Sequence, residues 1–158
     1  MQTKRTDVLG IAATVGLTGA VAVAGGVAGD FRSKWYVELR KPAWQPSGAT
    51  IGAVWSALYV SIATAGSLLW LERRRAGRTL LPLFLAQSLL NAAWTPIFTR
   101  AKRPDLATAE CAVLTAVNAG LVAEAWRVQR PAAVLLIPYL VWSAFATFLS
   151  GTIYRLNR

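Results

Sequence analysis

The chain has 158 residues, of which 55% are hydrophobic and only 15% charged, and its formal net charge is +10. Soluble domains carry roughly 25% charged residues, so this composition indicates a membrane protein and excludes an ordinary soluble domain. The sequence has no histidine and one cysteine, which removes the commonest metal and haem ligand and any intrachain disulfide. We therefore predict no metal site.

Five apolar segments are long enough to cross a bilayer. About 20 residues, rising about 1.5 Å each, span a hydrocarbon core about 30 Å thick. The segments that qualify are 8–28, 51–71, 79–99, 106–126 and 132–154. The linkers between the last four are short, so consecutive spans are antiparallel neighbours. We predict one all-α membrane domain over residues 1–158, a bundle of five transmembrane helices in a multi-pass protein of the cell membrane.

The first segment, 8–28, has two interpretations. Lys4 and Arg5 precede it, and Ala22-Val23-Ala24 is similar to the cleavage site of a secretory signal. Its length favours a retained span, because the apolar part of a signal is only roughly 7 to 15 residues. A stripe of small residues recurs every four positions and consists of Ala12, Gly16, Ala20, Ala24 and Ala28. Such a stripe lets helices approach closely, either inside the bundle or at the seam of a homodimer.

The linker at residues 29–50 is too apolar, and too rich in Trp, Tyr and Pro, to float in water. We predict that it packs against the bundle. Pro42 and Pro46 flank Trp44 and restrict the backbone, so the linker is expected to be partly pre-organised.

The basic residues lie at the ends of the apolar segments, where lipid head groups are expected. No soluble segment interleaves a basic run with aromatic residues, so we predict contact with the bilayer and no nucleic-acid partner. The two faces carry nearly equal numbers of Lys and Arg, so the positive-inside rule does not fix the orientation. An odd number of spans places the two termini on opposite sides of the membrane.

Two carboxylates fall inside the apolar segments, Glu110 and Glu124. Each lies near a segment end, and Arg127 is spaced to pair with Glu124. We interpret both as structural residues at the membrane interface. A proton-coupled exporter would need a carboxylate near the bilayer midplane, where the nearest polar residue of this segment is Asn118.

Tryptophan is unusually frequent, with seven residues in the chain. Those at or beyond segment ends, which fit an interfacial aromatic belt, are Trp35, Trp70 and Trp126. Those inside segments are Trp55, Trp94 and Trp142. A buried indole N–H needs a hydrogen-bond partner, and we expect Asn91, the Tyr139 hydroxyl or carbonyls freed by proline to provide it.

The stretch LLNAAWTPIFTR places polar Asn91 deep in an apolar run. Asn91 and Trp94 are three residues apart and share a helix face, while Pro96 bends the helix end. Asn91 would be costly against lipid, so we predict that this face points into an aromatic-lined pocket suited to a flat, largely apolar ligand. As a pocket residue, Asn91 is expected to tolerate replacement by leucine without loss of the fold.

Three motifs resemble those of the TSPO/MBR family, which comprises translocator proteins, tryptophan-rich sensory proteins and peripheral benzodiazepine receptors. The motifs are KPAWQPSG at 41–48, NAAWTPIF at 91–98 and PYLVWSAFATFLS at 138–150. They occur in the family's order in a five-span chain with a long first linker. The resemblance implies a homodimer that binds porphyrins of the protoporphyrin type, for transport, sequestration or sensing, and requires no cofactor.

The resemblance also implies a ligand site made of pocket and lid residues. The pocket residues are Trp55, Asn91, Trp94, Trp142 and Ala146. The lid residues are Tyr36, Trp44, Pro46 and Ile51. One alternative is light- and oxygen-dependent porphyrin degradation at a pocket tryptophan, Trp142 or Trp55. Another is transport of sterols or other small molecules, although Ser150 and Gly151 replace the Asn and aromatic residue of cholesterol-recognising members.

Overall fold

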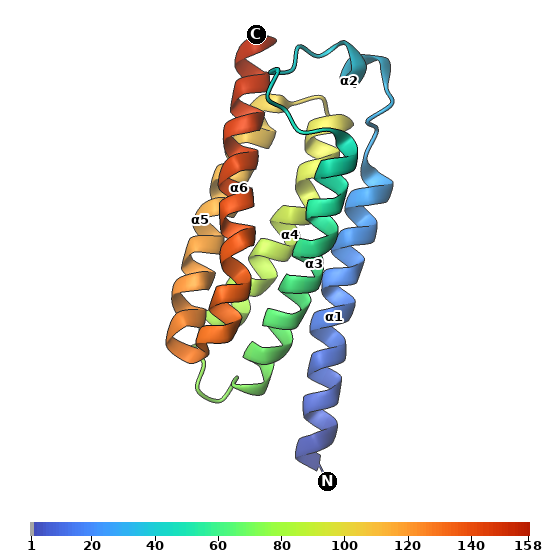
Figure 1. Ribbon diagram of the computed structural model, residues 1–158. Helices are drawn as coiled ribbons and strands as arrows, with labels where there is room; N and C mark the ends of the chain where they lie inside the picture. Colours follow the sequence, from blue (N-terminus) through green and yellow to red (C-terminus); the bar gives the residue numbers. More distant parts are fainter. Residues whose placement is uncertain (1) are drawn as a thin grey trace.

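The computed structural model describes residues 2–158 and shows a bundle of long helices (Figure 1). The long helices are α1 (Gln2–Ala28), α3 (Gly48–Leu71), α4 (Leu80–Thr99), α5 (Pro104–Val128) and α6 (Arg130–Leu156). A short helix, α2 (Lys34–Glu38), lies in the linker between α1 and α3. Five helices are long and apolar enough to cross a membrane, and the described residues form no strand. The predicted all-α, five-span architecture is confirmed.

The helix ends differ slightly from the predicted segments. The helices α1 and α6 extend beyond their apolar stretches, because polar residues near both ends of the chain continue the helical turns. The linker ends at residue 47, not 50, since Ser47 Oγ caps α3 by accepting a hydrogen bond from the Thr50 N–H at 3.1 Å. Helix α2 was not predicted, and Ser33 Oγ caps it by accepting from the Tyr36 N–H at 3.4 Å.

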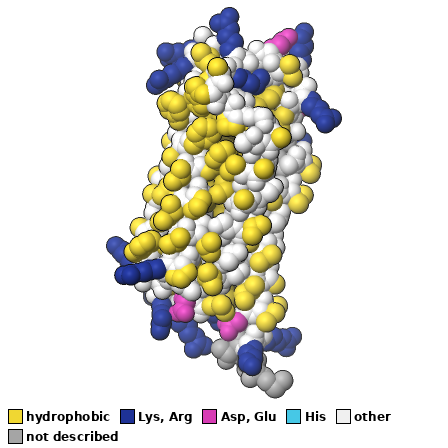
Figure 2. Space-filling model, viewed as in Figure 1, with side chains coloured by type: hydrophobic (Ala, Val, Ile, Leu, Met, Phe, Trp, Pro, Cys, Tyr) yellow, Lys and Arg dark blue, Asp and Glu magenta, His cyan; other side chains and the backbone are white. Residues whose placement is uncertain are grey.

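The two termini lie at opposite ends of the bundle, as expected for five spans (Figure 1). Lys and Arg gather at the same two ends, and hydrophobic side chains cover the surface between them (Figure 2). This distribution matches a bundle whose middle faces hydrocarbon and whose ends face lipid head groups.

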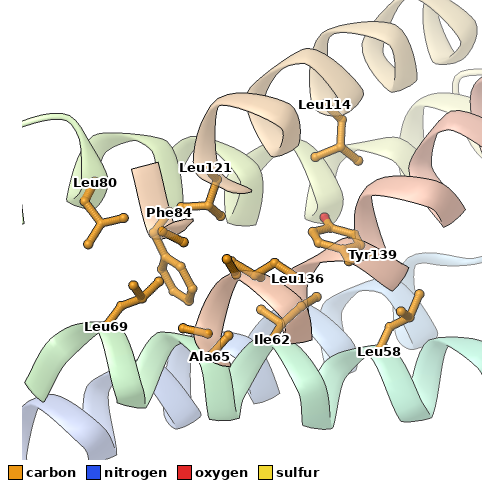
Figure 3. Packing of buried hydrophobic residues seen from close by; sticks show 13 residues of the cluster. Leu58, Ile62, Ala65, Leu69, Leu80, Phe84, Leu114, Leu121, Leu136 and Tyr139 are labelled. Carbon is orange, nitrogen blue, oxygen red and sulfur yellow. The ribbon is translucent and has the colours of Figure 1, made fainter. Parts of the chain in front are cut away.

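The main core lies between α3, α4, α5 and α6 and is largely aliphatic (Figure 3). The most extensive helix pair is α5 with α6, and α4 packs on α5. Ala65, Ala125, Ala132 and Ala133 are completely buried, which lets the helix backbones approach closely.

The main packing partners of helix α1 are α3 and α4. Gly10 and Gly66 mark this packing, because a Cβ at Gly10 would lie 1.8 Å from the Trp70 ring and one at Gly66 would lie 2.7 Å from Phe84 Cζ.

The stripe of small residues on α1 points away from the bundle. Ala12, Gly16, Ala20 and Ala24 are exposed, and nothing lies within 4 Å of the place that a Cβ at Gly16 would take. The interpretation that this stripe packs inside the bundle is therefore wrong for this chain. A homodimer seam stays a prediction.

Candidate ligand site

Asn91 lies at the centre of a hydrogen-bonded contact between three helices. Its side chain is 7% exposed, so the predicted inward orientation is confirmed. The Tyr59 hydroxyl of α3 donates to Asn91 Oδ1 at 3.1 Å, and Asn91 Nδ2 donates to the Tyr139 hydroxyl of α6 at 2.7 Å. Both polar atoms of the amide are thus bonded to tyrosines, which ties α4 to α3 and α6.

Aromatic rings surround this amide on the α3 side. Trp55 stacks on Tyr59 with ring centroids 5.4 Å apart and meets the edge of Tyr139 at 6.1 Å. Tyr59 lies one turn after Trp55 on the same helix face. The sequence contained this signal, although Tyr59 was not among the predicted site residues.

A second group of rings joins α6 to the linker. The Trp142 ring lies 5.0 Å from Phe145. Trp44 of the linker meets the edge of Phe145 at 6.0 Å and stacks on Phe148 at 5.3 Å. The structure therefore brings the predicted residues Trp44 and Trp142 to the same side of α6, through two phenylalanines that sequence reasoning did not select.

Trp94 belongs to a different cluster from Trp55 and Trp142. Its ring stacks on Phe98 at 5.0 Å, and Phe98 also meets the edges of Trp35 and Tyr36. Trp94 Nε1 is buried and has no hydrogen-bond partner among the described residues. The expectation of a partner for this indole is wrong, because Asn91 Oδ1 already accepts from the Tyr59 hydroxyl and the Tyr139 hydroxyl accepts from Asn91 Nδ2.

Hydrogen bonds tie the linker to the ends of α4 and α6, and another joins the end of α4 to the end of α1. The Asp30 N–H donates to Thr99 Oγ1 of α4 at 3.2 Å, and Arg100 Nε donates to the last carbonyl of α1 at 3.0 Å. At the other end, Asn157 after α6 pairs with the Arg40 backbone through two hydrogen bonds of 2.9 Å. The segment between these ties lies across one end of the bundle (Figure 1).

The remaining linker residues pack less tightly. Tyr36 is half-buried, and burial raises the pKa of its hydroxyl above the ordinary value. Lys41 Nζ lies 4.5 Å from the centre of the Tyr36 ring and donates to backbone carbonyls of the linker, including that of Tyr36. Trp44 is 46% exposed despite its ring contacts. The other predicted site residues, all half-buried, are Pro46, Ile51 and Ala146.

The space beside Asn91 is small. The cavity that Asn91 and Tyr59 share with Thr18 of α1 and Gln87 of α4 encloses about 10 Å³, which is room for one water molecule. Pockets for drug-sized ligands enclose about 300–1,000 Å³. The rings therefore stack on one another here, and a flat ligand would have to take the place of these ring–ring contacts.

The two carboxylates within the spans have different surroundings. Arg127 Nη1 donates to Glu124 Oε1 at 3.2 Å, which confirms the predicted pair. Both oxygens of Glu110 are buried and have no hydrogen-bond partner among the described residues. Because α5 begins at Pro104, Glu110 lies in the second turn of the helix and deeper than the interface position that we expected.

Comparison with known proteins decides the family. The pattern that defines the TspO/MBR family matches residues 11–155. The chain belongs to the TspO/MBR family. Over 123 residues it is 37% identical to the tryptophan-rich protein TspO of Bacillus cereus, which covers 78% of this chain and 80% of that protein.

Animal members of the TspO/MBR family are nearly as similar. The chain is 36% identical over 129 residues to the translocator protein of Ovis aries, covering 79% of this chain and 76% of that protein. It is 34% identical over 127 residues to the translocator protein of Homo sapiens, covering 78% of this chain and 75% of that protein. The family resemblance predicted from the three motifs is confirmed.

Proposed function

We propose that this TspO/MBR membrane protein binds porphyrins of the protoporphyrin type between α3, α4, α6 and the linker, for transport, sequestration or sensing. The observation that supports this most is the Asn91 amide, which is hydrogen-bonded to Tyr59 and Tyr139, and the rings of these two tyrosines contact Trp55. A polar group surrounded by rings inside a membrane suits a flat, apolar ligand that carries a few polar atoms. The names of the relatives, tryptophan-rich protein TspO and translocator protein, fit membrane binding or transport.

Two arginines of the linker suit the carboxylates of a protoporphyrin. The two lysines of the linker already have partners. Lys34 Nζ lies 3.8 Å from Glu38 Oε1, and Lys41 Nζ donates to linker carbonyls. The side chains of Arg32 and Arg40 are exposed and have no hydrogen-bond or ion-pair partner among the described residues. Arginine binds carboxylates in a bidentate manner, so we infer that these two meet the ligand's acidic groups where it enters.

Entry of the ligand requires the linker to move. The ring of Trp44 contacts the α6 rings of Phe145 and Phe148 and remains 46% exposed. Contacts between exposed rings are the easiest to exchange, because each aromatic pair contributes only about 0.5–1.5 kcal/mol. A porphyrin would replace these contacts with its own face stacked on Trp44 or on the α6 rings.

A metal-free porphyrin is expected to bind at least as well as haem. The chain has no histidine, and Cys111 is buried in α5. The hydroxyls of Tyr59 and Tyr139 are already hydrogen-bonded to Asn91. Haem gains affinity from an axial ligand such as His, Cys, Met or Tyr. A haem affinity far above that of protoporphyrin, together with a shift of the Soret band in Cys111→Ala, would contradict this expectation.

Titration with protoporphyrin tests the proposal through quenching of tryptophan fluorescence in detergent. Trp44 and Trp126 are each 46% exposed, but Trp126 lies near the end of α5 away from the linker, so the pair forms a matched comparison. We expect Trp44→Ala to weaken binding by about 2-fold to 13-fold, which corresponds to one aromatic pair of about 0.5–1.5 kcal/mol. Trp126→Ala should leave the affinity unchanged. Equal loss in both variants would contradict a site at the linker.

Illumination of the complex in air separates binding from chemistry. If the protein only binds porphyrin, the absorption of bound porphyrin should bleach no faster than that of porphyrin in empty detergent micelles. Faster bleaching that needs light and oxygen, and that disappears in Trp142→Phe, would instead support the degradation alternative.

We also propose that the chain forms a homodimer through the exposed face of α1. The residues that this face offers are Ala12, Gly16, Ala20 and Ala24. Small residues allow close approach of a second helix. Gly16→Ile should shift the protein from dimer to monomer in light scattering, and an unchanged mass would contradict this seam.

A further inference from the structure

A groove lies far from the candidate ligand site, at the end of the bundle that carries the α3–α4 connection. It encloses about 450 Å³ between α4 and α5. The residues of its wall that matter here are Arg78, Pro82, Leu83, Gly120, Glu124 and Arg127. Neither the porphyrin proposal nor the three family motifs involve any of them.

The floor of the groove is apolar and results from a missing side chain. A Cβ placed at Gly120 would make an ordinary contact of 3.6 Å with Leu83 Cδ2. Gly120 therefore leaves a channel beside Leu83, and Pro82 forms part of its wall. Because α4 and α5 both cross the membrane, a channel with these walls faces the hydrocarbon chains of lipids.

The rim of the groove is cationic. Arg127 Nη1 donates to Glu124 Oε1, which leaves its other N–H groups available, and the Arg127 side chain is 77% exposed. Arg78 is exposed and forms no hydrogen bond or ion pair within residues 2–158. Two arginines and one glutamate give the rim a net charge of +1.

We propose that this groove is a binding site for an anionic phospholipid. The phosphate lies between Arg78 and Arg127, and one acyl chain runs along Leu83 and Gly120. Arginine recognises phosphate oxygens through paired N–H donors. Glu124 is already paired with Arg127, and the unpaired Arg78 repels the ammonium group of a zwitterionic lipid, so the rim favours a head group with net negative charge.

The first test compares two pairs of arginines at the same end of the full-length protein in mild detergent. Native mass spectrometry measures the dissociation constants of dioleoyl phosphatidylglycerol and dioleoyl phosphatidylcholine. Arg78→Gln with Arg127→Gln should weaken phosphatidylglycerol binding by about 30-fold, because each basic residue near an anionic head group contributes about 5-fold. The control is Arg74→Gln with Arg130→Gln, which removes the same charge outside the groove and should change the constant by less than about 3-fold.

The second test fills the floor. Gly120→Leu places a large side chain in the channel, and leucine also favours a helix over glycine. This variant should keep its melting temperature without lipid but lose binding of both lipids. Its porphyrin affinity should equal that of the unmodified chain, because the linker and the rings around Asn91 are untouched.

Three results would overturn the site. One is an equal loss of phosphatidylglycerol in the groove and control pairs, which would mean that general charge attracts the lipid. The second is equal binding of phosphatidylcholine or phosphatidylethanolamine by the unmodified protein. The third is displacement of phosphatidylglycerol by millimolar inorganic phosphate, which would mean that the rim binds free anions and the floor binds no chain.

Discussion

The two halves of the bundle are built from different side chains. In the half near the α3–α4 connection, the space between the helices is filled by Leu69, Phe84, Leu121 and Leu136 (Figure 3). Fully buried alanines allow these helices to approach closely. In the half near the linker, rings such as Trp55 and Trp142 are only partly buried and meet other rings. The first half is stabilised mainly by aliphatic packing. In the second half, contacts between partly buried rings contribute more.

Buried polar atoms without a partner among the described residues occur in both halves. Near the linker they are Gln45 Oε1, Trp94 Nε1 and both oxygens of Glu110. Near the α3–α4 connection they are Trp70 Nε1 and Gln129 Oε1. Unsatisfied buried groups reduce stability, so neither half is free of this cost.

The largest effect is expected in the aliphatic half, at Gly66. A Cβ there would lie 2.7 Å from Phe84 Cζ and 3.3 Å from Thr14 Cβ, so Gly66→Val should lower the free energy of unfolding by about 3 kcal/mol or more. Gly52→Val on the same helix is the control, because nothing lies within 4 Å of its added Cβ. Melting curves in detergent measure both. Equal stability of the two variants would contradict the close packing of α1, α3 and α4.

Asn91→Leu should have the next largest effect. The variant removes two hydrogen bonds, the one that Asn91 donates to the buried Tyr139 hydroxyl and the one that Asn91 accepts from Tyr59. We expect a loss of about 1–2 kcal/mol, at the upper end of measured interhelical hydrogen bonds in membranes. The sequence alone predicted that the fold tolerates this change, and the two tyrosine bonds reverse that expectation.

The control for Asn91 is Tyr59→Phe, which removes one of the two bonds and keeps the ring on Trp55. Its loss of stability should be smaller. In the same variants, porphyrin affinity should fall about 5-fold to 150-fold for Asn91→Leu, because a ligand polar group is left unpaired. Unchanged affinity in the folded fraction would make Asn91 a structural residue only.

A gain in stability is expected at Glu110. Its buried oxygens lack partners among the described residues, so Glu110→Gln, which removes a buried charge, should raise stability by about 1 kcal/mol. Glu124→Gln, which breaks the pair with Arg127, should lower it slightly or leave it unchanged. A clear loss of stability in Glu110→Gln would show that this carboxylate has a partner in the membrane.

In the linker, the expected change affects ligand affinity more than stability. Replacing Pro42 and Pro46 with alanine makes the segment around Trp44 less pre-organised, and each proline contributes about 0.4–1 kcal/mol in this way. Because ligand binding orders the linker, the loss of porphyrin-binding free energy should exceed the loss of unfolding free energy in the ligand-free protein. Titrations give the first quantity, and melting curves give the second. Equal damage to both would make the linker a structural element of the bundle.

The sequence predicted the local features of this molecule and missed the contacts between distant residues. Segment length and hydropathy located all five spans, and helical spacing predicted the Glu124–Arg127 pair. The cost of exposing an amide to lipid placed Asn91 inside. Its two tyrosine partners depend on how α3 and α6 are rotated against α4, and no local pattern encodes that rotation.

The same limit explains the errors. The spacing of small residues on α1 is identical whether the partner is another helix of the chain or a second copy, so it did not reveal that Gly16 faces outward. Trp94 Nε1 was expected to find a partner partly because Asn91 lies on the same helix face. The Asn91 oxygen already accepts from Tyr59, which lies 32 positions earlier in the chain.

The single residue between α5 and α6 has a consequence for the order of assembly. Gln129 donates its N–H to the Ala125 carbonyl and accepts from the Ala133 N–H, so it ends one helix and starts the next. The most extensive helix pair is therefore also the one with the shortest connection, and such local contacts form fast. The contact between α1 and α3 must instead close the linker of residues 29–47, so it carries a larger loop-closure cost than the α5–α6 pair.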